Sequence, residues 1–306
     1  MKGSKIVGTG SALPAKIVSN HDLSQKLDTS HDWILTRTGI HQRHIVSGDE
    51  SALTLAVDAA NKALEDTTKD DIDAVIVATM TPYKNMPCMA SLLQKQLLLS
   101  PGLAFDINVA CSGFVYAINI ADMLIKSGSA NKVLLVAVDV MSKILDWQDR
   151  STCVLFGDGA GAVVIEASDE NKLIGGIMRA NGNFEASLQA GPLLTMQGKE
   201  VFKNAVKELE QIVPETLNKF NLEFSDIDWL VAHQANIRII QATAKLLKLP
   251  MEKAIVTIDK HANTAAASIP LALDHAVRTN QIQRGECVLL EAFGAGFSWG
   301  SFVLRY

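Results

Sequence analysis

The chain has 306 residues, of which 48% are hydrophobic and 20% are charged, and its mean hydropathy is +0.17. This length and composition predict a folded protein with one large core or two smaller ones, and they exclude a disordered chain. The formal net charge of -5 argues against nucleic acid as the main partner.

The cysteines and the apolar runs indicate the compartment. The four cysteines lie far apart without CxxC spacing, so neither a zinc site nor a disulfide framework is expected. The N-terminus lacks the apolar core of a signal peptide. Apolar runs such as residues 133–138 have the length of a strand and are too short to span a bilayer. We therefore expect a cytoplasmic protein with reduced thiols and no membrane partner.

The first half of the chain alternates strands and helices. Residues 6–14 imitate a dinucleotide-binding fingerprint, but the third glycine is missing and Pro14 lies where a helix should begin, so they predict a strand and a turn. Hydrophobic periodicity then predicts helices over residues 29–40, 51–64 and 91–99, and strands over residues 74–78 and 133–138. The glycine-rich residues 156–161 precede a strand instead of opening a helix, so tight turns and close packing explain them better than a phosphate site.

The second half of the chain echoes the first at one offset. Asp71, Asn108 and Val133 recur with their neighbours as Asp226, Asn263 and Val288, and each pair has the same separation (263 − 108 = 155). Chance echoes of strand–helix alternation are the competing interpretation. The shared offset favours a duplication and predicts two similar α/β halves.

Cys111 lies where an apolar strand turns into an apolar helix that runs to Lys126. The first N–H groups of a helix are unpaired and its dipole favours negative charge there. This position predicts an ionised, nucleophilic thiol. The alternative is a small buried hydrophobic residue, which is what most free cysteines are.

Two polar residues of the second half occupy related positions. His233 directly follows the predicted strand 229–232, and Asn263 precedes the helix that mirrors the cysteine helix, in which Ala266 aligns with Cys111. Equivalent strand ends of two such halves meet at a shared crevice. We therefore expect Cys111, His233 and Asn263 to lie together, although a lone His or Asn is more often a structural hydrogen-bonding residue.

Several motifs together resemble the β-ketoacyl-acyl-carrier-protein synthase III family, the initiating condensing enzymes of bacterial fatty-acid synthesis. The matching stretches are residues 32–40, 110–114, 156–162, 229–236, 263–270 and 294–300. The resemblance implies a thiolase-like α/β fold in which two pseudo-symmetric halves form a five-layered αβαβα arrangement. Residues 1–170 would form the half with the nucleophilic cysteine, and residues 171–306 the half with the His and Asn.

The resemblance also implies a decarboxylative Claisen condensation. Cys111 would take the acetyl group of acetyl-CoA as a thioester, with the backbone N–H groups of Cys111 and Gly296 as the oxyanion hole. Malonyl-acyl-carrier-protein would then lose CO2 while His233 and Asn263 donate hydrogen bonds to its thioester oxygen, giving acetoacetyl-acyl-carrier-protein. No metal or resident cofactor is implied, because acetyl-CoA is a substrate.

Further roles come from the resemblance. Trp33 and Arg150 would enclose the adenine of CoA, and the same channel would be lined by Thr29, Arg37, Asn236 and Arg238. In the implied homodimer, Met86 would border the acyl pocket of the partner subunit. Acetyl-specific members often have Phe there, so a longer or branched primer stays open. The chain also departs from the family pattern at Asn108 and at Ser151.

A basic patch is the expected docking surface for the acidic carrier protein. A helix is predicted over residues 237–249, and Arg238, Lys245 and Lys248 fall on one side of it. Lys203 and Lys207 on a neighbouring helix would extend the patch. The alternative is that these are ordinary solvated charges.

Three other functions compete with this interpretation. A papain-like cysteine hydrolase has the same Cys, His, Asn order, but the residues around Cys111 do not match the protease signature. A related thiolase-fold synthase with another acyl acceptor is the second. A non-catalytic module that binds acyl groups or carrier protein is the third, and the intact Cys, His and Asn argue against it.

Overall fold

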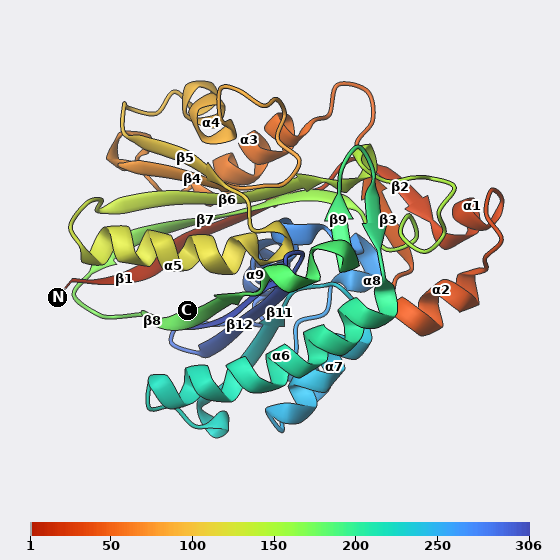
Figure 1. Cartoon of the computed structure of the whole chain (residues 1–306). Helices are drawn as coiled ribbons and strands as arrows, with labels where there is room; N and C mark the ends of the chain where they lie inside the picture. The colour runs from red at the N-terminus through yellow and green to blue at the C-terminus, as the bar shows by residue number, and fades with distance from the viewer. Residues whose placement is uncertain (1) are drawn as a thin grey trace.

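The computed structural model describes residues 2–306, and two β-sheets organise it (Figure 1). The first sheet has the strand order β1-β7-β6-β4-β5 and the second has the order β11-β12-β13-β8. The first consists of β1 (Gly3–Ala12), β4 (Ala74–Ala78), β5 (Leu103–Ile107), β6 (Lys132–Val140) and β7 (Asp158–Ser168). The second consists of β8 (Leu173–Ala180), β11 (Trp229–Ala232), β12 (Cys287–Gly294) and β13 (Ser298–Arg305).

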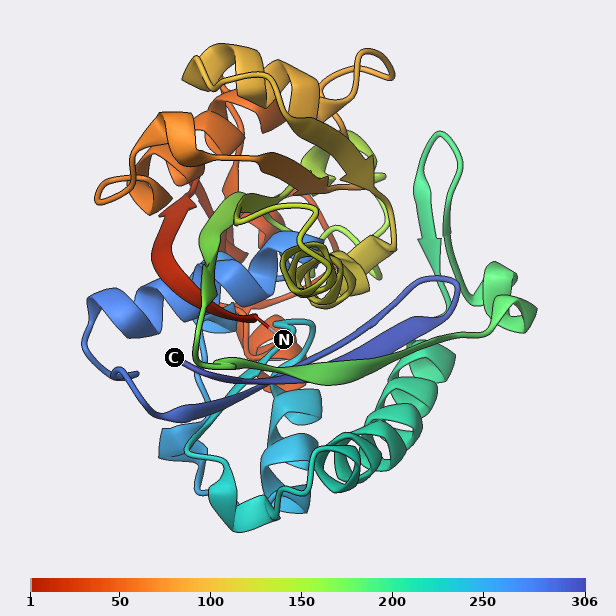
Figure 2. The same cartoon turned by 90° about the vertical axis from the view of Figure 1, so that its left-hand side faces the viewer.

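Helices cover both sheets and fill the space between them, as Figure 2 shows from the side. Helices α3 (Ala52–Ala63) and α4 (Met89–Leu97) pack on the outer face of the first sheet. Helices α5 (Gly113–Lys126) and α9 (Ser268–Arg278) lie between the two sheets. Helices α6 (Gly198–Lys219) and α7 (Ile237–Leu246) cover the second sheet. These layers confirm the predicted αβαβα arrangement.

The repeat is visible in the strand register. In the first sheet β4 pairs in parallel with β6 so that Ala74 lies opposite Val133, and in the second β11 pairs in parallel with β12 so that Trp229 lies opposite Val288. Both members of each pair are related by the offset found in the sequence (229 − 74 = 155). Sheet pairing therefore confirms the predicted duplication.

The turns before the two central helices repeat as well. A short 3₁₀ turn precedes each helix, Ala110–Ser112 before α5 and Ala265–Ala267 before α9. Ala110 and Ala265 both have left-handed backbone conformations, with φ of 46° and 50°. Such angles are uncommon for a residue with a Cβ, so the same strained turn has been kept in both halves.

Local signals explain several helix boundaries. Ser51 caps α3 and Ser30 caps α2 (His31–Thr38) by accepting a backbone N–H of the first turn. Gly39 ends α2 with φ of 82°, where a Cβ would be strained. Asn236 caps α7 through its side-chain oxygen, which accepts the Arg238 N–H.

Helix α7 is shorter than predicted, because it ends at Leu246 and not at residue 249. Lys248 has a left-handed φ of 54°, and the Leu249 N–H returns to the carbonyl of Ala244. This backbone turn closes the helix, so Lys248 lies beyond its end.

Close packing accounts for the glycines of residues 156–161, as predicted. A Cβ on Gly157 would lie 2.7 Å from the carbonyl oxygen of His261, and a Cβ on Gly161 would lie 2.7 Å from the backbone nitrogen of Leu271 in α9. Strand β7 therefore approaches the central helices as closely as its backbone allows.

Smaller elements complete the chain, and most of them were not predicted. Two short antiparallel pairs are formed by β2 (Lys16–Ser19) with β3 (Gln42–Ile45) and, as a hairpin, by β9 (Leu188–Ala190) with β10 (Leu194–Met196). The remaining helices are α1 (Asn20–Ser24) and α8 (Ile258–His261). Within residues 2–306, no helix combines the length and the apolar character needed to cross a membrane.

Candidate active site

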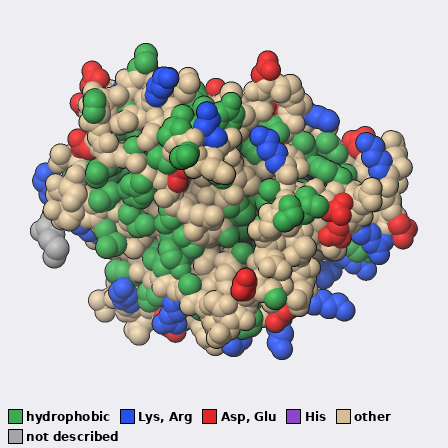
Figure 3. Space-filling view, turned by 45° about the horizontal axis from the view of Figure 1, so that its top comes forward, with side chains coloured by type: hydrophobic (Ala, Val, Ile, Leu, Met, Phe, Trp, Pro, Cys, Tyr) green, Lys and Arg blue, Asp and Glu red, His purple; other side chains and the backbone are tan. Residues whose placement is uncertain are grey.

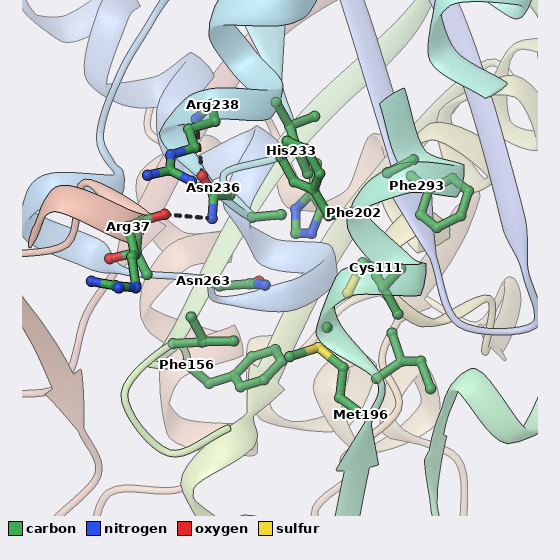
Figure 4. A pocket seen from close by; sticks show the side chains of 18 of the residues that line it. Arg37, Cys111, Phe156, Met196, Phe202, His233, Asn236, Arg238, Asn263 and Phe293 are labelled. Carbon is green, nitrogen blue, oxygen red and sulfur yellow. Dashed lines mark hydrogen bonds between the residues drawn. The ribbon is translucent and has the colours of Figure 1, made fainter. Parts of the chain in front are cut away.

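A cavity of about 660 Å³ lies where the strand ends of the two halves meet, and its walls include Cys111, His233 and Asn263. Figure 4 shows the three side chains around one space. Each residue is only slightly exposed, at 7%, 5% and 6%. The structure therefore brings together the residues that the repeat predicted to meet.

Cys111 lies in the 3₁₀ turn before α5, and the end of β12 passes directly beside it. A Cβ on Gly294 would lie 2.9 Å from the Cys111 backbone nitrogen, so glycine is needed for this approach. Burial, with a contribution from the charge of Asp139, raises the pKa of the Cys111 thiol to about 12. The prediction of an ionised thiol is therefore wrong for the ligand-free chain, because desolvation outweighs the helix start.

The His233 ring is hydrogen-bonded to the hydroxyl of Ser268, the first residue of the central helix α9. Its Nδ1 lies 2.6 Å from Ser268 Oγ, which also accepts the Gln234 N–H at 3.2 Å. Because Oγ already accepts the Gln234 N–H, we assign the Ser268 O–H as the donor to Nδ1, which places the ring proton on Nε2. Burial lowers the pKa of His233 to about 4. The imidazole is therefore neutral at pH 7 and presents an N–H group to the pocket.

Asn263 is oriented by the turn that follows it. Its Oδ1 accepts the Ala265 N–H at 2.9 Å, which leaves the amide NH2 as the group that faces the pocket. In the first half, Asn108 Oδ1 accepts the Ala110 N–H at 3.2 Å in the same way. The oxygen of each Asn thus stabilises a left-handed alanine, and only Asn263 lines the cavity.

Asp139 ties the two halves together beneath the site. Its buried carboxylate accepts hydrogen bonds from the Met80 N–H at 2.9 Å and from the Ala266 N–H at 3.1 Å, in addition to the hydroxyls of Thr79 and Thr81. Burial raises the pKa of Asp139 to about 6, against the lowering effect of these donors. The carboxylate therefore fixes the turn after Asn263 to the strand ends of the first half.

The residues expected to bind CoA fall into two groups. Trp33, Arg37, Asn236 and Arg238 line the same cavity as the cysteine. The Arg37 guanidinium lies 4.5 Å above the Trp33 ring, and Asn236 Nδ2 donates to the Arg37 carbonyl at 3.0 Å. Thr29 is not part of the cavity wall.

Arg150 also lies outside the cavity wall but remains beside the same indole. Its guanidinium lies 5.2 Å from the centre of the Trp33 ring and donates to the carbonyl of Asp28. An aromatic base stacked between the two side chains needs about 3.5 Å on each side. Arg150 must therefore move outward before a purine can enter this gap.

The other predicted residues lie away from the cavity. Met86 is 82% exposed and does not line the pocket of its own chain. Lys203, Lys245 and Lys248 are exposed and likewise lie outside the cavity wall. Lys199, in the first turn of α6, is a cationic residue of the wall that the sequence interpretation missed.

Glu291 is the other charged side chain that was missed. It lies on β12 within an apolar run, is 1% exposed and lines the cavity. A single acidic residue inside a buried strand was the signal that could have identified it. Within residues 2–306, no group of three or more His, Cys, Asp or Glu side chains is arranged to hold a metal ion.

Comparison with known proteins identifies the family. Residues 105–182 match the family model described as 3-oxoacyl-[acyl-carrier-protein] synthase III, and residues 217–306 match the model of its C-terminal part. The chain is 49% identical to the β-ketoacyl-[acyl-carrier-protein] synthase III of Alkalilimnicola ehrlichii, and the alignment covers 100% of each chain. A relative of the same name from Xanthomonas campestris is also 49% identical, with 99% of this chain and 98% of the relative covered.

Solved structures agree with the sequence matches. The crystal structure of 3-oxoacyl-[acyl-carrier-protein] synthase III from Aquifex aeolicus superposes with a TM-score of 0.97 at 44% identity, covering 99% of this chain and 100% of that one. The predicted thiolase-like fold and acyl-transferring condensing class are thereby confirmed. The chain belongs to the β-ketoacyl-[acyl-carrier-protein] synthase III family.

Proposed function

We propose that this chain condenses acetyl-CoA with malonyl-acyl-carrier-protein to give acetoacetyl-acyl-carrier-protein, CoA and CO2, the initiating step of type II fatty-acid synthesis. One observation carries the proposal: two neutral N–H donors, His233 Nε2 and the Asn263 amide, line the same cavity as the Cys111 thiol. A thioester enolate needs uncharged donors that keep their protons while negative charge develops on oxygen.

In the first half-reaction Cys111 Sγ attacks the acetyl carbonyl, and the thiol proton goes to the leaving sulfur of CoA. Because the pKa of the thiol is about 12, its deprotonation accompanies the attack. The backbone N–H groups of Cys111 and Gly296 would hold the oxyanion. Gly296 suits this role because it lies two residues after Gly294, where the end of β12 passes beside Cys111.

In the second half-reaction malonyl-acyl-carrier-protein loses CO2. His233 and Asn263 donate to its thioester oxygen, and the resulting carbanion attacks the acetyl-Cys111 carbonyl. The fixed Oδ1 of Asn263 and the occupied Nδ1 of His233 keep both donors in this orientation.

The cavity suits the CoA arm of the substrate. Arg37, Lys199 and Arg238 supply positive charge to its wall, which suits the phosphates. Trp33 offers an aromatic face for the adenine, and Arg150 would cover it after moving outward. The hydroxyl of Thr29 is buried without a hydrogen-bond partner in residues 2–306 and lies outside the cavity wall, so its role in CoA binding rests on the family resemblance alone.

A homodimer is part of the proposal. Strand β5 is an edge of the first sheet, and its backbone groups are open to pairing. Leu103, Met123, Tyr83 and Met86 are exposed on this side, at 45%, 60%, 47% and 82%. Figure 3 shows hydrophobic side chains gathered over this face. A second copy that covers the patch would bring Met86 toward the acyl pocket of its partner.

The carrier protein would dock beside the cavity mouth. Arg238 on α7 lines the cavity, Lys245 lies two turns further along α7, and Lys203 lies on α6, which packs against α7. Lys248 lies beyond the helix end but on the exposed surface nearby. Such a patch would attract an acidic partner although the chain is net negative.

Two finer points accompany this function. The strands of the first sheet end at Ser168 and those of the second begin at Leu173, which supports a division into halves near residue 170. We expect a cytoplasmic location, because acylation by acetyl-CoA requires Cys111 to remain a reduced thiol and thiols stay reduced in the cytoplasm.

A cysteine hydrolase is not favoured, because in such an enzyme the imidazole takes the thiol proton. His233 instead presents an N–H group to the cavity. The matching relatives that cover the whole chain are condensing enzymes by name. The exposed Met86 is the one feature that favours a branched primer or one longer than acetyl.

The test is to separate the two half-reactions. Incubation with acetyl-CoA should add one acetyl group to the wild type and none to Cys111→Ala, as measured by intact mass. Addition of malonyl-acyl-carrier-protein should then give acetoacetyl-acyl-carrier-protein and the unmodified enzyme. Acetylation of Cys111→Ala, or release of acetate in place of the condensation product, contradicts the proposal.

A further inference from the structure

Glu291 is buried with the hydroxyl of Thr243 as its one side-chain partner. The side chain is 1% exposed, and its Oε2 forms no hydrogen bond within residues 2–306. Glu291 nevertheless belongs to the wall of the cavity that holds Cys111. A buried polar atom without a partner lowers the free energy of unfolding, so its presence in the cavity wall indicates a functional role.

The surroundings of Glu291 are almost entirely apolar. Ala205 and Leu209 of α6 and Ile239 of α7 line the same part of the cavity wall, and Ala232 lies beside Glu291 on β11. The polar groups from packed elements are the hydroxyls of Thr243 on α7 and of Ser301 opposite on β13. The other titratable or charged side chains of the cavity wall are Arg37, Cys111, Lys199, His233 and Arg238.

The position keeps the carboxyl protonated. Burial raises the pKa of Glu291 to about 8, with a smaller lowering effect from the Thr243 hydroxyl. At neutral pH the cavity therefore contains a carboxylic acid that holds an exchangeable proton.

The condensation half-reaction consumes one proton. Acetyl-Cys111, the malonyl carboxylate and one proton become acetoacetyl-acyl-carrier-protein, CO2 and the free Cys111 thiol. The carbon–carboxylate bond breaks, a carbon–carbon bond forms, and the carbon–sulfur bond of the acyl-enzyme breaks with its electron pair going to Sγ. The proton must reach Sγ, because a thiol with a pKa of about 12 does not stay ionised.

Cys111, His233 and the two arginines of the cavity wall do not supply this proton. The original Cys111 proton has left with CoA in the first half-reaction. His233 is neutral, with a pKa of about 4, and its one ring proton is needed for the enolate. The guanidinium groups of Arg37 and Arg238 do not give up protons at neutral pH.

We infer that Glu291 supplies the proton that Cys111 takes up when the condensation product is released. The transfer runs through water, for which the cavity has room, and the carboxylate is reprotonated from solvent before the next turnover. The backbone links Glu291 to the site as well, because the His233 N–H donates to the Glu291 carbonyl at 2.8 Å. Glu291 would thus act in one half-reaction only.

This inference rests on the proposed function, and the experiment separates the two. Single-turnover rates are measured for acetylation by acetyl-CoA and for condensation of the purified acetyl-enzyme with malonyl-acyl-carrier-protein, between pH 6 and pH 10. The variant is Glu291→Gln, which keeps the shape and the neutral charge of the acid. The matched control is Glu208→Gln, a carboxyl on α6 that pairs with Lys207 outside the cavity. Absence of condensation in the wild type would count against the proposed function itself.

In the wild type, condensation should slow above about pH 8, where Glu291 ionises, and acetylation should not. Glu291→Gln should lower the condensation rate at pH 7 by about tenfold or more, lose the alkaline decline and acetylate within about twofold of the wild type. A merely structural residue would slow both half-reactions together. Equal losses in both, or an alkaline decline that persists in Glu291→Gln, would overturn the inference.

If Glu291→Gln does not fold, the pH dependence of the wild type still tests the inference. The wild type alone must show the alkaline decline in condensation and not in acetylation. Glu291→Asp, which retains an acid, should keep the decline while its midpoint shifts. A wild-type condensation rate that is flat from pH 6 to pH 10 would overturn the inference without any variant.

Discussion

His233 Nδ1 lies 2.6 Å from Ser268 Oγ, and the same oxygen accepts the Gln234 N–H. Ser268 is the first residue of α9, so the orientation of the imidazole depends on the central helix of the second half. The hydroxyl determines which ring nitrogen carries the proton and hence which chemistry His233 can perform.

We expect Ser268→Ala to slow malonyl decarboxylation by about tenfold to a hundredfold, because the ring is then free to adopt the tautomer that has no Nε2 proton. Acetylation of Cys111 should change less. The control is Ser4→Ala, which removes a buried hydroxyl that binds Asp122 far from the cavity. Equal slowing of both half-reactions would contradict the tautomer assignment.

Asn263→Asp tests the amide oxygen and the amide NH2 of Asn263 separately. The aspartate keeps an oxygen for the Ala265 N–H but loses the NH2 donor, so decarboxylation should fall by about a hundredfold to a thousandfold. The matched control is Asn108→Asp, which changes the related turn of the first half and leaves the cavity wall intact. The prediction is wrong if the two variants lose activity to the same extent.

The dimer prediction concerns the exposed edge at β5. Leu103→Asp should convert the dimer to monomer at micromolar concentration, because a charge would replace an apolar side chain at the interface. Sedimentation provides the measurement, and Ile17→Asp, an exposed position in the β2–β3 strand pair, is the control. Met86→Phe should in addition narrow the range of primers accepted. A wild-type monomer with full activity would refute the dimer.

For carrier docking, Lys245→Glu should raise the KM for malonyl-acyl-carrier-protein by about threefold to tenfold, and added salt should weaken the wild type similarly. Turnover with malonyl-CoA should change little, since Lys245 is not part of the cavity wall. Lys69→Glu, in the 3₁₀ turn that precedes β4 of the first sheet, is the control. An unchanged KM in both Lys245→Glu and high salt would place the docking surface elsewhere.

Acid stability should depend on His261, which is partly buried. Burial lowers the pKa of His261 to about 4, below the usual 6.5, so the unfolded chain binds a proton that the folded chain does not. This contribution to stability is present above pH 6.5 and is lost as the pH falls toward 4. His261→Asn should therefore lose less stability than the wild type over this interval in urea titrations. A stability difference between the two that does not vary with pH would contradict the assignment.

Much of the architecture could be predicted because the repeat constrains it. One offset relates Asn108 to Asn263 and Val133 to Val288, and it proved to hold for the strand register and for the strained turns at Ala110 and Ala265. Strand ends that are equivalent by repeat must meet, which is why Cys111, His233 and Asn263 were expected in one place.

Properties that depend on three-dimensional surroundings could not be predicted. The position of Cys111 at a helix start suggested an ionised thiol. Its burial and the charge of the nearby Asp139 instead raise the pKa of the thiol, which favours the protonated form. The helix predicted over residues 237–249 extends beyond the observed end of α7 at Leu246, because nothing in its composition indicates the left-handed turn at Lys248. The β9–β10 hairpin was missed because its strands are only three residues each.

The shared turn at Asn108 and Asn263 also suggests how the protein could have evolved. An ancestral pair of identical units would have carried the same residues at both positions, but here the first copy has Ala78 where the second has His233, and the second has Ala266 where the first has Cys111. Each copy therefore supplies one part of the chemistry and depends on the other for the rest. Placing a cysteine at Ala266 should not create a second reaction centre, because the histidine that would serve it has been replaced by alanine.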